Sequence, residues 1–255
     1  MAIVRTPFQG IMNIIRFNWH FYTLSFLLFI VLYLLGFTLE GKLLMRIISV
    51  CNYFLLYTII ASLGVSYYIY DLSDLYKLKW IEIDNTIAYS TLLNITAGFD
   101  ETSLLIKQKF PKNDLNVCDF YDPSRHTEIS IRRARKAYPT HEGTFSVNTS
   151  ALPFPNSSVD LICVIFSAHE IRNGEERAIF FKEMERILKP RGRIIITEHL
   201  RDIPNFLAYN IGFFHFYSFK SWMKTIECSN LILHQTVKTT PFISTFILKK
   251  HGSTS

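Results

Sequence analysis

Two long stretches near the start of the chain carry only uncharged residues, most of them apolar. No Asp, Glu, Lys or Arg occurs from 21 to 39, nor again from 47 to 70. A helix needs roughly 20 such residues to cross a bilayer core of about 30 Å. A core helix of this length would carry a polar face, and a secretory signal has an apolar core of only about 7 to 15 residues. The pattern therefore predicts two transmembrane helices, at about 21–39 and 47–70.

The link between these two helices is too short for anything but a tight helical hairpin, so both of its open ends face the same side of the membrane. Arg5 and Arg16 precede the first helix, and Lys77 and Lys79 follow the second. Because positive residues gather on the cytoplasmic side, we expect both termini and everything after the hairpin to be cytoplasmic.

The pattern changes after residue 80, where short β-branched runs alternate with amphipathic stretches of helical length. This alternation is typical of a parallel sheet covered by helices. We expect a membrane anchor over 1–70, a linker over 71–90 and one α/β domain over 91–255. Strands are predicted at 91–95, 115–118, 144–147, 161–166 and 193–197, helices at 101–109, 123–138, 175–188 and 219–226, and a terminal antiparallel hairpin from 231–237 and 242–248.

Composition and charge indicate which partner and which cellular compartment to expect. The net charge is +6, but no nucleic-acid-binding motif accompanies it, so an anionic membrane surface is the simpler partner. The densest basic run, at 131–136, is read either as a solvated helix face or as part of that surface contact. The four cysteines are scattered without paired spacing and are expected to be reduced, and the sequence shows no metal-binding cluster. Nothing in the sequence indicates an oligomeric state.

Four consecutive segments closely resemble class I S-adenosylmethionine-dependent methyltransferases of the small-molecule type. They are LPFPNSSVDL at 152–161, SAHEI at 167–171, FKEMERILKP at 181–190 and GRIIITEH at 192–199. The resemblance extends over roughly 91–250. It implies a Rossmann-like, seven-stranded, mostly parallel sheet with a C-terminal antiparallel hairpin, and S-adenosylmethionine as the cofactor.

The resemblance is weakest at the first strand-to-helix turn, 94–100. The family shows an acidic residue followed by three spaced glycines there, whereas this chain has Asn94, Thr96, Gly98 and Asp100, so only one glycine remains. Gly98 would let the backbone approach the cofactor, and the amides that open the next helix are expected to receive the methionine carboxylate. Asp100 would repel that carboxylate unless it points elsewhere.

Three further strand ends complete the expected cofactor site. Asp119 follows the second strand about 20 residues after the glycine turn, where the family places the carboxylate that binds both ribose hydroxyls. Asn148 and Thr149 correspond to the loop that contacts adenine, with Asn148 in place of the usual Asp. Ser167 ends the fourth strand.

Methyl transfer is an in-line displacement that needs the acceptor atom held against the methyl group, and a hydroxyl acceptor also needs a base. An imidazole suits that role. His169 and His199 follow the fourth and fifth strands and are the catalytic candidates, with Glu170 beside the first. The alternative interpretation is that each histidine has a structural or capping role.

An aromatic segment at 205–217 lies where the resembling enzymes build a cover over the acceptor. Tyr209, Phe213 and His215 are its candidate substrate-binding residues, and His215 is also a third candidate base. The same segment is equally consistent with core packing against the sheet.

The sequence thus predicts an S-adenosylmethionine-dependent methyltransferase that acts at the membrane on a small, hydrophobic or lipid-like acceptor. The depleted glycine turn leaves open an alternative, a catalytically inactive protein that keeps the fold for a regulatory or scaffolding role. A nicotinamide-dependent oxidoreductase is disfavoured because the full Gly-x-Gly-x-x-Gly turn and a Tyr-x-x-x-Lys pair are absent from the sequence.

Overall fold

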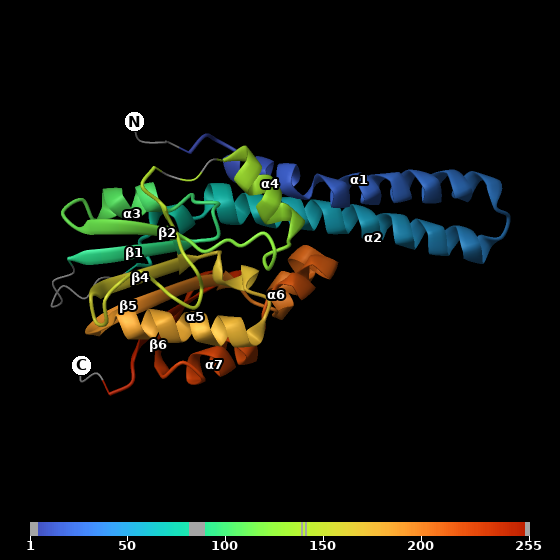
Figure 1. Ribbon diagram of the computed structural model, residues 1–255. Helices are drawn as coiled ribbons and strands as arrows, with labels where there is room; N and C mark the ends of the chain where they lie inside the picture. Colours follow the sequence, from blue (N-terminus) through green and yellow to red (C-terminus); the bar gives the residue numbers. More distant parts are fainter. Residues whose placement is uncertain (1–4, 82–89, 139, 141, 253–255) are drawn as a thin grey trace.

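The computed structural model describes residues 5–81, 90–138, 140 and 142–252, and shows a long helical hairpin that projects from an α/β domain (Figure 1). The hairpin consists of α1 (Gln9–Thr38) and α2 (Lys42–Tyr67). Both helices are long and apolar enough, by length and composition, to cross a membrane. The short connection after Thr38 agrees with the predicted tight hairpin.

Helix α1 begins earlier than the charge-free stretch indicated. It is kinked at Asn18. The side-chain amide of Asn18 donates to the backbone carbonyl of Ile14 (3.2 Å). The turns before the kink pack on the α/β domain and bury Gly10, Asn13 and Phe17. The start of the predicted anchor is therefore part of the globular core.

The connection from the hairpin to the sheet is also folded for most of its length. Helix α2 continues into a π-helical turn, η1 (Tyr68–Leu72), and a 3₁₀ turn, η2 (Leu75–Lys77). Ile69, Leu75 and Leu78 are buried against the sheet. Residues 82–89 of the predicted linker lie outside the described residues.

The sheet has seven strands in the order β3-β2-β1-β4-β5-β7-β6. The first five are parallel, while β7 is antiparallel to both β5 and β6. The expected mostly parallel sheet with a C-terminal antiparallel hairpin is therefore confirmed. The strands are β1 (Thr91–Thr96), β2 (Asp114–Asp119), β3 (Phe145–Ser146), β4 (Val159–Ile165), β5 (Leu188–His199), β6 (Leu231–Thr240) and β7 (Ile243–Lys250).

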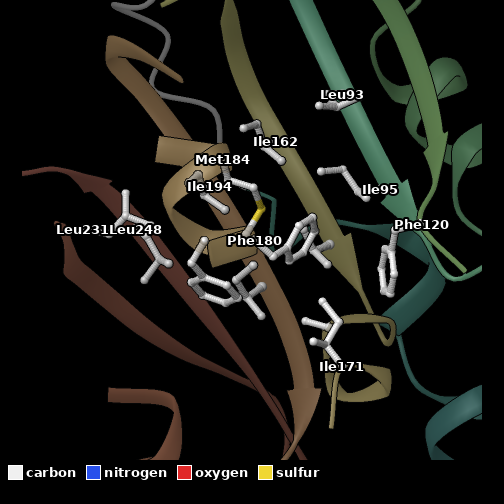
Figure 2. Close-up of a cluster of buried hydrophobic side chains, with 14 of the residues drawn as sticks. Leu93, Ile95, Phe120, Ile162, Ile171, Phe180, Met184, Ile194, Leu231 and Leu248 are labelled. Atoms are coloured by element: carbon white, nitrogen blue, oxygen red, sulfur yellow. The ribbon is translucent and has the colours of Figure 1, made fainter. Parts of the chain in front are cut away.

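Alternate residues of the central strands feed two separate cores, because successive side chains of a strand point to opposite faces. Ile162 and Ile194 pack with Phe180 of α5 (Gly174–Ile187) on the face shown in Figure 2. Leu161 and Ile195, one residue away, pack on the other face. Helices α4 (Ile129–Ala137), α5 and α7 (Phe219–Glu227) cover the first face, and α3 (Ser103–Lys109) and residues of η1 and η2 cover the second.

Three local features differ from the prediction. The second helix begins at Ile129 rather than 123, because Asp122 accepts from the amide of Ser124 (2.9 Å) and holds 122–126 in a turn. The segment at 189–192, between the predicted helix and the predicted strand, is extended and forms the start of β5 with a bulge against β4. The aromatic segment contains a short helix that was not predicted, α6 (Ile203–Tyr209), followed by the 3₁₀ turn η4 (Asn210–His215). Asp202 caps α6 by accepting from Asn205.

The four cysteines are free in the structure, as expected.

Candidate active site

The carboxyl ends of the parallel strands bring the expected cofactor residues to one edge of the sheet. Thr96 and Asp119 are register partners at the ends of β1 and β2. Gly98 follows with a φ of 84°, a conformation that favours glycine, and a Cβ added there would lie 2.8 Å from Asp119 Oδ2. Ser167 donates from its hydroxyl to the carbonyl of Ile95 (2.9 Å) and so ties the end of β4 to β1.

The side chain of Asn94 lies beneath this edge. It is fully buried, and its amide donates to the hydroxyls of Thr102 (3.0 Å) and Ser103 (2.8 Å) at the start of α3. Thr96 similarly accepts from the amide of Gly98 (3.2 Å). Asn94 and Thr96, which were predicted to bind the cofactor, therefore stabilise the turn at 94–100 through hydrogen bonds within the protein.

A cavity of about 280 Å³ begins at Phe120, the residue after Asp119, and lies on the side of β3. Its walls come from the residues after β2, including Tyr121 and His126, and from the loop after β3, including Asn148 and Thr149. Thr149 donates to Glu176 (2.7 Å), which closes the cavity from α5. His126 Nε2 is buried in the wall without a hydrogen-bond partner among the described residues. This is the location that the sequence predicted for adenine.

The carboxylate of Asp119 already has a partner on each oxygen. Oδ1 accepts from the amide of Tyr121 (2.9 Å), and Oδ2 accepts from Arg135 Nη1 (2.6 Å). The same guanidinium also donates to the carbonyl of Ala97 (3.0 Å) and overlaps the space that a Cβ on Gly98 would need. Arg135 therefore covers the space between the expected ribose carboxylate and the glycine turn.

The amides that open α3 were expected to be free for an anion, and this was wrong. Asp100 Oδ1 accepts from the amides of both Thr102 and Ser103 (2.9 Å each). Its carboxylate thus occupies the place that the methionine carboxylate was expected to take. It points toward the helix rather than into the site, because a short acidic side chain two or three residues before a helix satisfies the first free amides.

A second cavity, of about 110 Å³, lies between the first turns of α1 and the ends of β1 and β4. It is lined mainly by apolar and aromatic side chains, including Phe17, Phe99 and Phe166, with the carboxylate of Glu101 at one side. Glu101 receives hydrogen bonds from Arg5 (2.7 Å) and Tyr76 (2.8 Å), which fasten the start of α1 over this cavity.

The first catalytic candidate, His169, sits in a cluster of charged groups just beyond β4. Its Nδ1 lies 2.7 Å from Glu198 Oε2 and its Nε2 lies 3.4 Å from Glu170 Oε1. Burial lowers the pKa of His169, but the two carboxylates outweigh it and raise the pKa to about 10. Burial raises the pKa of Glu170, yet the contact with His169 reverses this and leaves the pKa below its usual value. His169 and Glu170 therefore favour their charged forms.

His199, the second candidate, is buried and has a partner at each nitrogen. Asn205 Oδ1 lies 3.0 Å from Nδ1, the hydroxyl of Tyr70 lies 2.8 Å from Nε2, and Phe216 stacks on the ring. Burial lowers its pKa to about 4, so the ring is neutral at physiological pH. In this arrangement His199 fastens α6 and η1 to the end of β5.

The aromatic segment at 205–217 forms a cover beside both histidines. The ring of His215 contacts that of His169, with centroids 5.0 Å apart, and the Tyr209 ring packs edge-on against His199 (5.4 Å). Phe213 is half-buried between Phe206 and Phe214. Of the three predicted substrate residues, only His215 is in direct contact with His169.

A sequence profile of the methyltransferase domain matches residues 119–196, from Asp119 through most of β5. Together with the strand order, in which a mostly parallel sheet ends in an antiparallel β7, this match shows that the chain has the fold of the class I S-adenosylmethionine-dependent methyltransferases.

Two curated relatives agree with this assignment. The demethylmenaquinone methyltransferase of Thermotoga maritima is 29% identical over 150 residues, which cover 57% of this chain and 59% of the relative. The ubiquinone/menaquinone biosynthesis C-methyltransferase UbiE of Geotalea daltonii is 27% identical over 133 residues, 51% of this chain and 52% of the relative. The chain thus spans little more than half the length of these relatives.

The fold also resembles a solved structure, the PH0226 protein of Pyrococcus horikoshii OT3. The two superpose with a TM-score of 0.51 at 14% sequence identity, over 72% of this chain and 95% of the other. At this identity the likeness concerns the fold alone.

S-adenosylmethionine, the cofactor of this family, fits the described residues at its nucleoside end. The cavity beside Tyr121 has the polar, partly unpartnered wall that a purine requires, and Asp119 stands next to it. The ribose would take the place of the Arg135 guanidinium, whose side chain is 27% exposed. Binding of the cofactor would therefore displace the ion pair between Arg135 and Asp119.

Several site residues were missed from the sequence. Arg135 belongs to the basic run at 131–136, and nothing in a run of charges shows which member turns inward. In the same run, Arg133 donates to the carbonyl of Phe17 (2.7 Å), so the solvated-face reading of this run was wrong for both residues. Glu128 and Glu176 reach the site from the starts of α4 and α5 and carried no motif that could have marked them.

Proposed function

We propose that this methyltransferase moves the methyl group of S-adenosylmethionine to a small, hydrophobic acceptor dissolved in the membrane. The observation that carries the proposal is the position of the aromatic cover. Tyr57, within the apolar part of α2, donates to the carbonyl of Leu207 in α6 (3.0 Å). The cover over the histidines is therefore continuous with the helical hairpin.

The surface of this cover is unusually apolar for a face turned to water. Ile203 and Ile211 are 75% and 84% exposed, and Phe206, Leu207 and Phe214 are also exposed. Contiguous exposed apolar side chains mark contact with a membrane or a partner. Because α6 packs against α2, the bilayer that holds the hairpin is the partner we infer for this surface.

The hairpin itself supports the same placement. With α1 and α2 in the bilayer, Arg16 and Lys77 would lie near the open end of the hairpin, and we propose that this end and the α/β domain are cytoplasmic. An acceptor that enters from the bilayer then reaches His169 under the aromatic cover without crossing water.

The chemistry at the acceptor requires a nucleophilic atom. In the transfer, the bond between sulfur and methyl breaks with its electrons left on sulfur, and the acceptor forms a bond to the methyl carbon. The acceptor's proton must leave to solvent, because His169 already carries a positive charge. The charged ring of His169 would then stabilise the negative oxygen that remains on the acceptor. Phenols and enols lose a proton more readily than alcohols and suit this site.

The printed names of the relatives point to the same class of acceptor. One is a demethylmenaquinone methyltransferase and the other acts in ubiquinone and menaquinone biosynthesis. Quinone precursors are aromatic lipids with ionisable hydroxyl groups. An acceptor of this kind is the one that we propose for this chain.

The test uses the full chain in lipid nanodiscs with methyl-labelled S-adenosylmethionine and a membrane lipid extract. We expect the label in the organic phase, in a product that is heavier than its precursor by one methylene group. Label found only in water-soluble products would refute the membrane acceptor. The same chain with Asp119→Ala is the control for transfer that depends on the cofactor site.

One observation favours a second candidate, a regulatory protein that binds no cofactor. Arg135 pairs with Asp119, and Asp100 occupies the amides of α3, so the site is partly closed from within. Calorimetry separates the two candidates, because a regulatory protein closed in this way gives no heat with S-adenosylmethionine.

A further inference from the structure

Three potential metal ligands meet beyond the end of β4. His169 and Glu170 belong to the 3₁₀ turn Ala168–Glu170, and His215 ends η4, more than 40 residues later in the chain. One nitrogen of each imidazole and one carboxylate oxygen lie within 4.8 Å of one another. We propose that these three side chains bind a divalent transition-metal ion of the zinc type.

The carboxylate of Glu170 is the first reason. The side chain is only 4% exposed, and its Oε2 has no hydrogen-bond partner among the described residues. An unpartnered buried oxygen costs roughly 1–3 kcal/mol, and more when it is charged. A cation bound by both oxygens of the Glu170 carboxylate would satisfy Oε2 as well as Oε1.

The support around the two histidines is the second reason. Glu198 Oε2 lies 2.7 Å from Nδ1 of His169, and Glu128 Oε1 lies 3.2 Å from Nδ1 of His215. Histidines that bind metals commonly donate one N–H to a carboxylate, which leaves the other nitrogen unprotonated for the ion. Both imidazoles can adopt this tautomer. Arg172 also lies 3.0 Å from Nδ1 of His215, and metal binding would select the proton position that favours Glu128.

The charge around the cluster is the third reason. The ionisable groups in contact with the two imidazoles are the carboxylates of Glu128, Glu170 and Glu198 and the guanidinium of Arg172. With His169 protonated, three negative charges face the two positive charges of Arg172 and His169, which leaves one negative charge in excess. A divalent cation that displaces the proton of His169 balances this excess.

The geometry agrees with a zinc-type ion rather than with magnesium. Nε2 of His169 and Oε1 of Glu170 are 3.4 Å apart, roughly the separation of two ligands on a tetrahedral ion with bonds of about 2.0–2.1 Å. Two imidazoles with one carboxylate suit zinc, cobalt or iron, whereas magnesium prefers oxygen ligands. Three protein ligands leave a coordination position open. If the proposed function holds, an oxygen of the acceptor would occupy that position and be polarised there.

The test is a titration of the untagged full chain, in detergent and freed of metal, with Co²⁺ alone. We expect one Co²⁺ per chain, a visible absorption band typical of low coordination, and displacement by Zn²⁺ but not by Mg²⁺. Glu170→Gln and His215→Ala should abolish the band. Glu198→Gln should weaken binding by about 10- to 100-fold, the usual effect of losing a carboxylate behind a ligating histidine.

His234→Ala is the matched control, since His234 is exposed on β6 and takes no part in the cluster. It should bind Co²⁺ as the unaltered chain does. Because Glu170→Gln alters a buried position, His215→Ala on the partly exposed cover keeps the test valid if the first variant fails to fold. Binding that is absent from the unaltered chain, or unaffected by His215→Ala, would overturn the proposal. The titration contains neither cofactor nor acceptor, so its failure is distinct from a failure of methyl transfer.

Discussion

Arg135 Nη1 donates to Asp119 Oδ2 at 2.6 Å, across the space where the ribose of the cofactor would lie. The carboxylate that the family uses for ribose is thus held by a side chain of the same protein. Cofactor and guanidinium compete for it. Helix α4 also carries Arg133, which binds α1, so the competition takes place on a helix that contacts the hairpin.

Removing the guanidinium should therefore strengthen the binding of the cofactor. We expect Arg135→Ala to tighten the binding of S-adenosylmethionine by up to about fivefold. A partly exposed ion pair contributes roughly 0.2–1 kcal/mol, and this cost of displacement would disappear. Isothermal titration calorimetry of the full chain in detergent measures the change.

Arg132→Ala serves as the matched control, because Arg132 is the exposed arginine on the same helix. It should leave affinity unchanged. Weaker binding by Arg135→Ala would show instead that Arg135 holds the cofactor.

The neutral state of His199 predicts a loss of stability in acid. The folded protein has a pKa of about 4 for this ring, because burial disfavours the charged form, whereas an unfolded chain takes up the proton near 6.5. The unfolded state therefore binds more protons between these values, and stability falls as the pH drops from about 6.5 to 4. This contribution is on the order of 3 kcal/mol.

Thermal unfolding in detergent across that pH range, for the unaltered chain and for His199→Gln, isolates the effect. Gln keeps hydrogen-bonding capacity toward Asn205 and Tyr70 but does not titrate. The variant should lose the corresponding part of the acid dependence, and identical pH profiles would contradict a neutral, buried His199.

Glu101 should matter for the attachment of α1. Its carboxylate accepts from Arg5, Gln9, Asn13 and Tyr76, which join the start of α1 and η2 to the loop before α3. We expect Glu101→Ala to lower the free energy of unfolding by roughly 1–3 kcal/mol, because four donors lose this acceptor. Glu227→Ala, at an exposed position of α7, should have little effect on the same denaturation curve. Equal curves for both variants would mean that this attachment contributes nothing.

The apolar cover predicts a defect that is limited to the acceptor. Ile211 is 84% exposed, so Ile211→Asp should fold normally and bind the cofactor as before. A charge there opposes contact with the bilayer, and we expect a several-fold rise in KM for a lipid-dissolved acceptor with kcat little changed. Ile179→Asp on α5 is the control, since Ile179 is also exposed but lies away from the cover. If both variants have the same KM, the cover does not contact the membrane.

The order of elements could be predicted because it depends on local patterns. Consecutive apolar residues such as Leu161 and Ile162 indicate a strand that is buried on both faces. The motifs at 152–199 then indicate where that strand lies in the sheet of a known family. The predicted start of α4 was wrong because one side chain, Asp122, stabilises a turn that competes with the helix. The folded start of α1 was missed because its packing on the sheet depends on contacts far apart in the sequence, such as that of Tyr138 with Asn13.

The candidate site was predictable only where a motif marks it. Asp119 and His169 follow strands and could be found in that way. Arg135 lies on α4 and Glu128 directly before it, and their roles depend on which way a charged side chain turns after the fold is complete. The meeting of His215 with His169 and Glu170 likewise requires the path of the cover, which the sequence leaves open.

The most direct test is the calorimetric titration of the full chain with S-adenosylmethionine, beside the Asp119→Ala variant. The structure predicts one site per chain, with affinity reduced at least about tenfold in the variant, because two hydrogen bonds from the ribose to a charged group are lost. Absence of binding to the unaltered chain, or equal affinity of the two proteins, would contradict the account of this site.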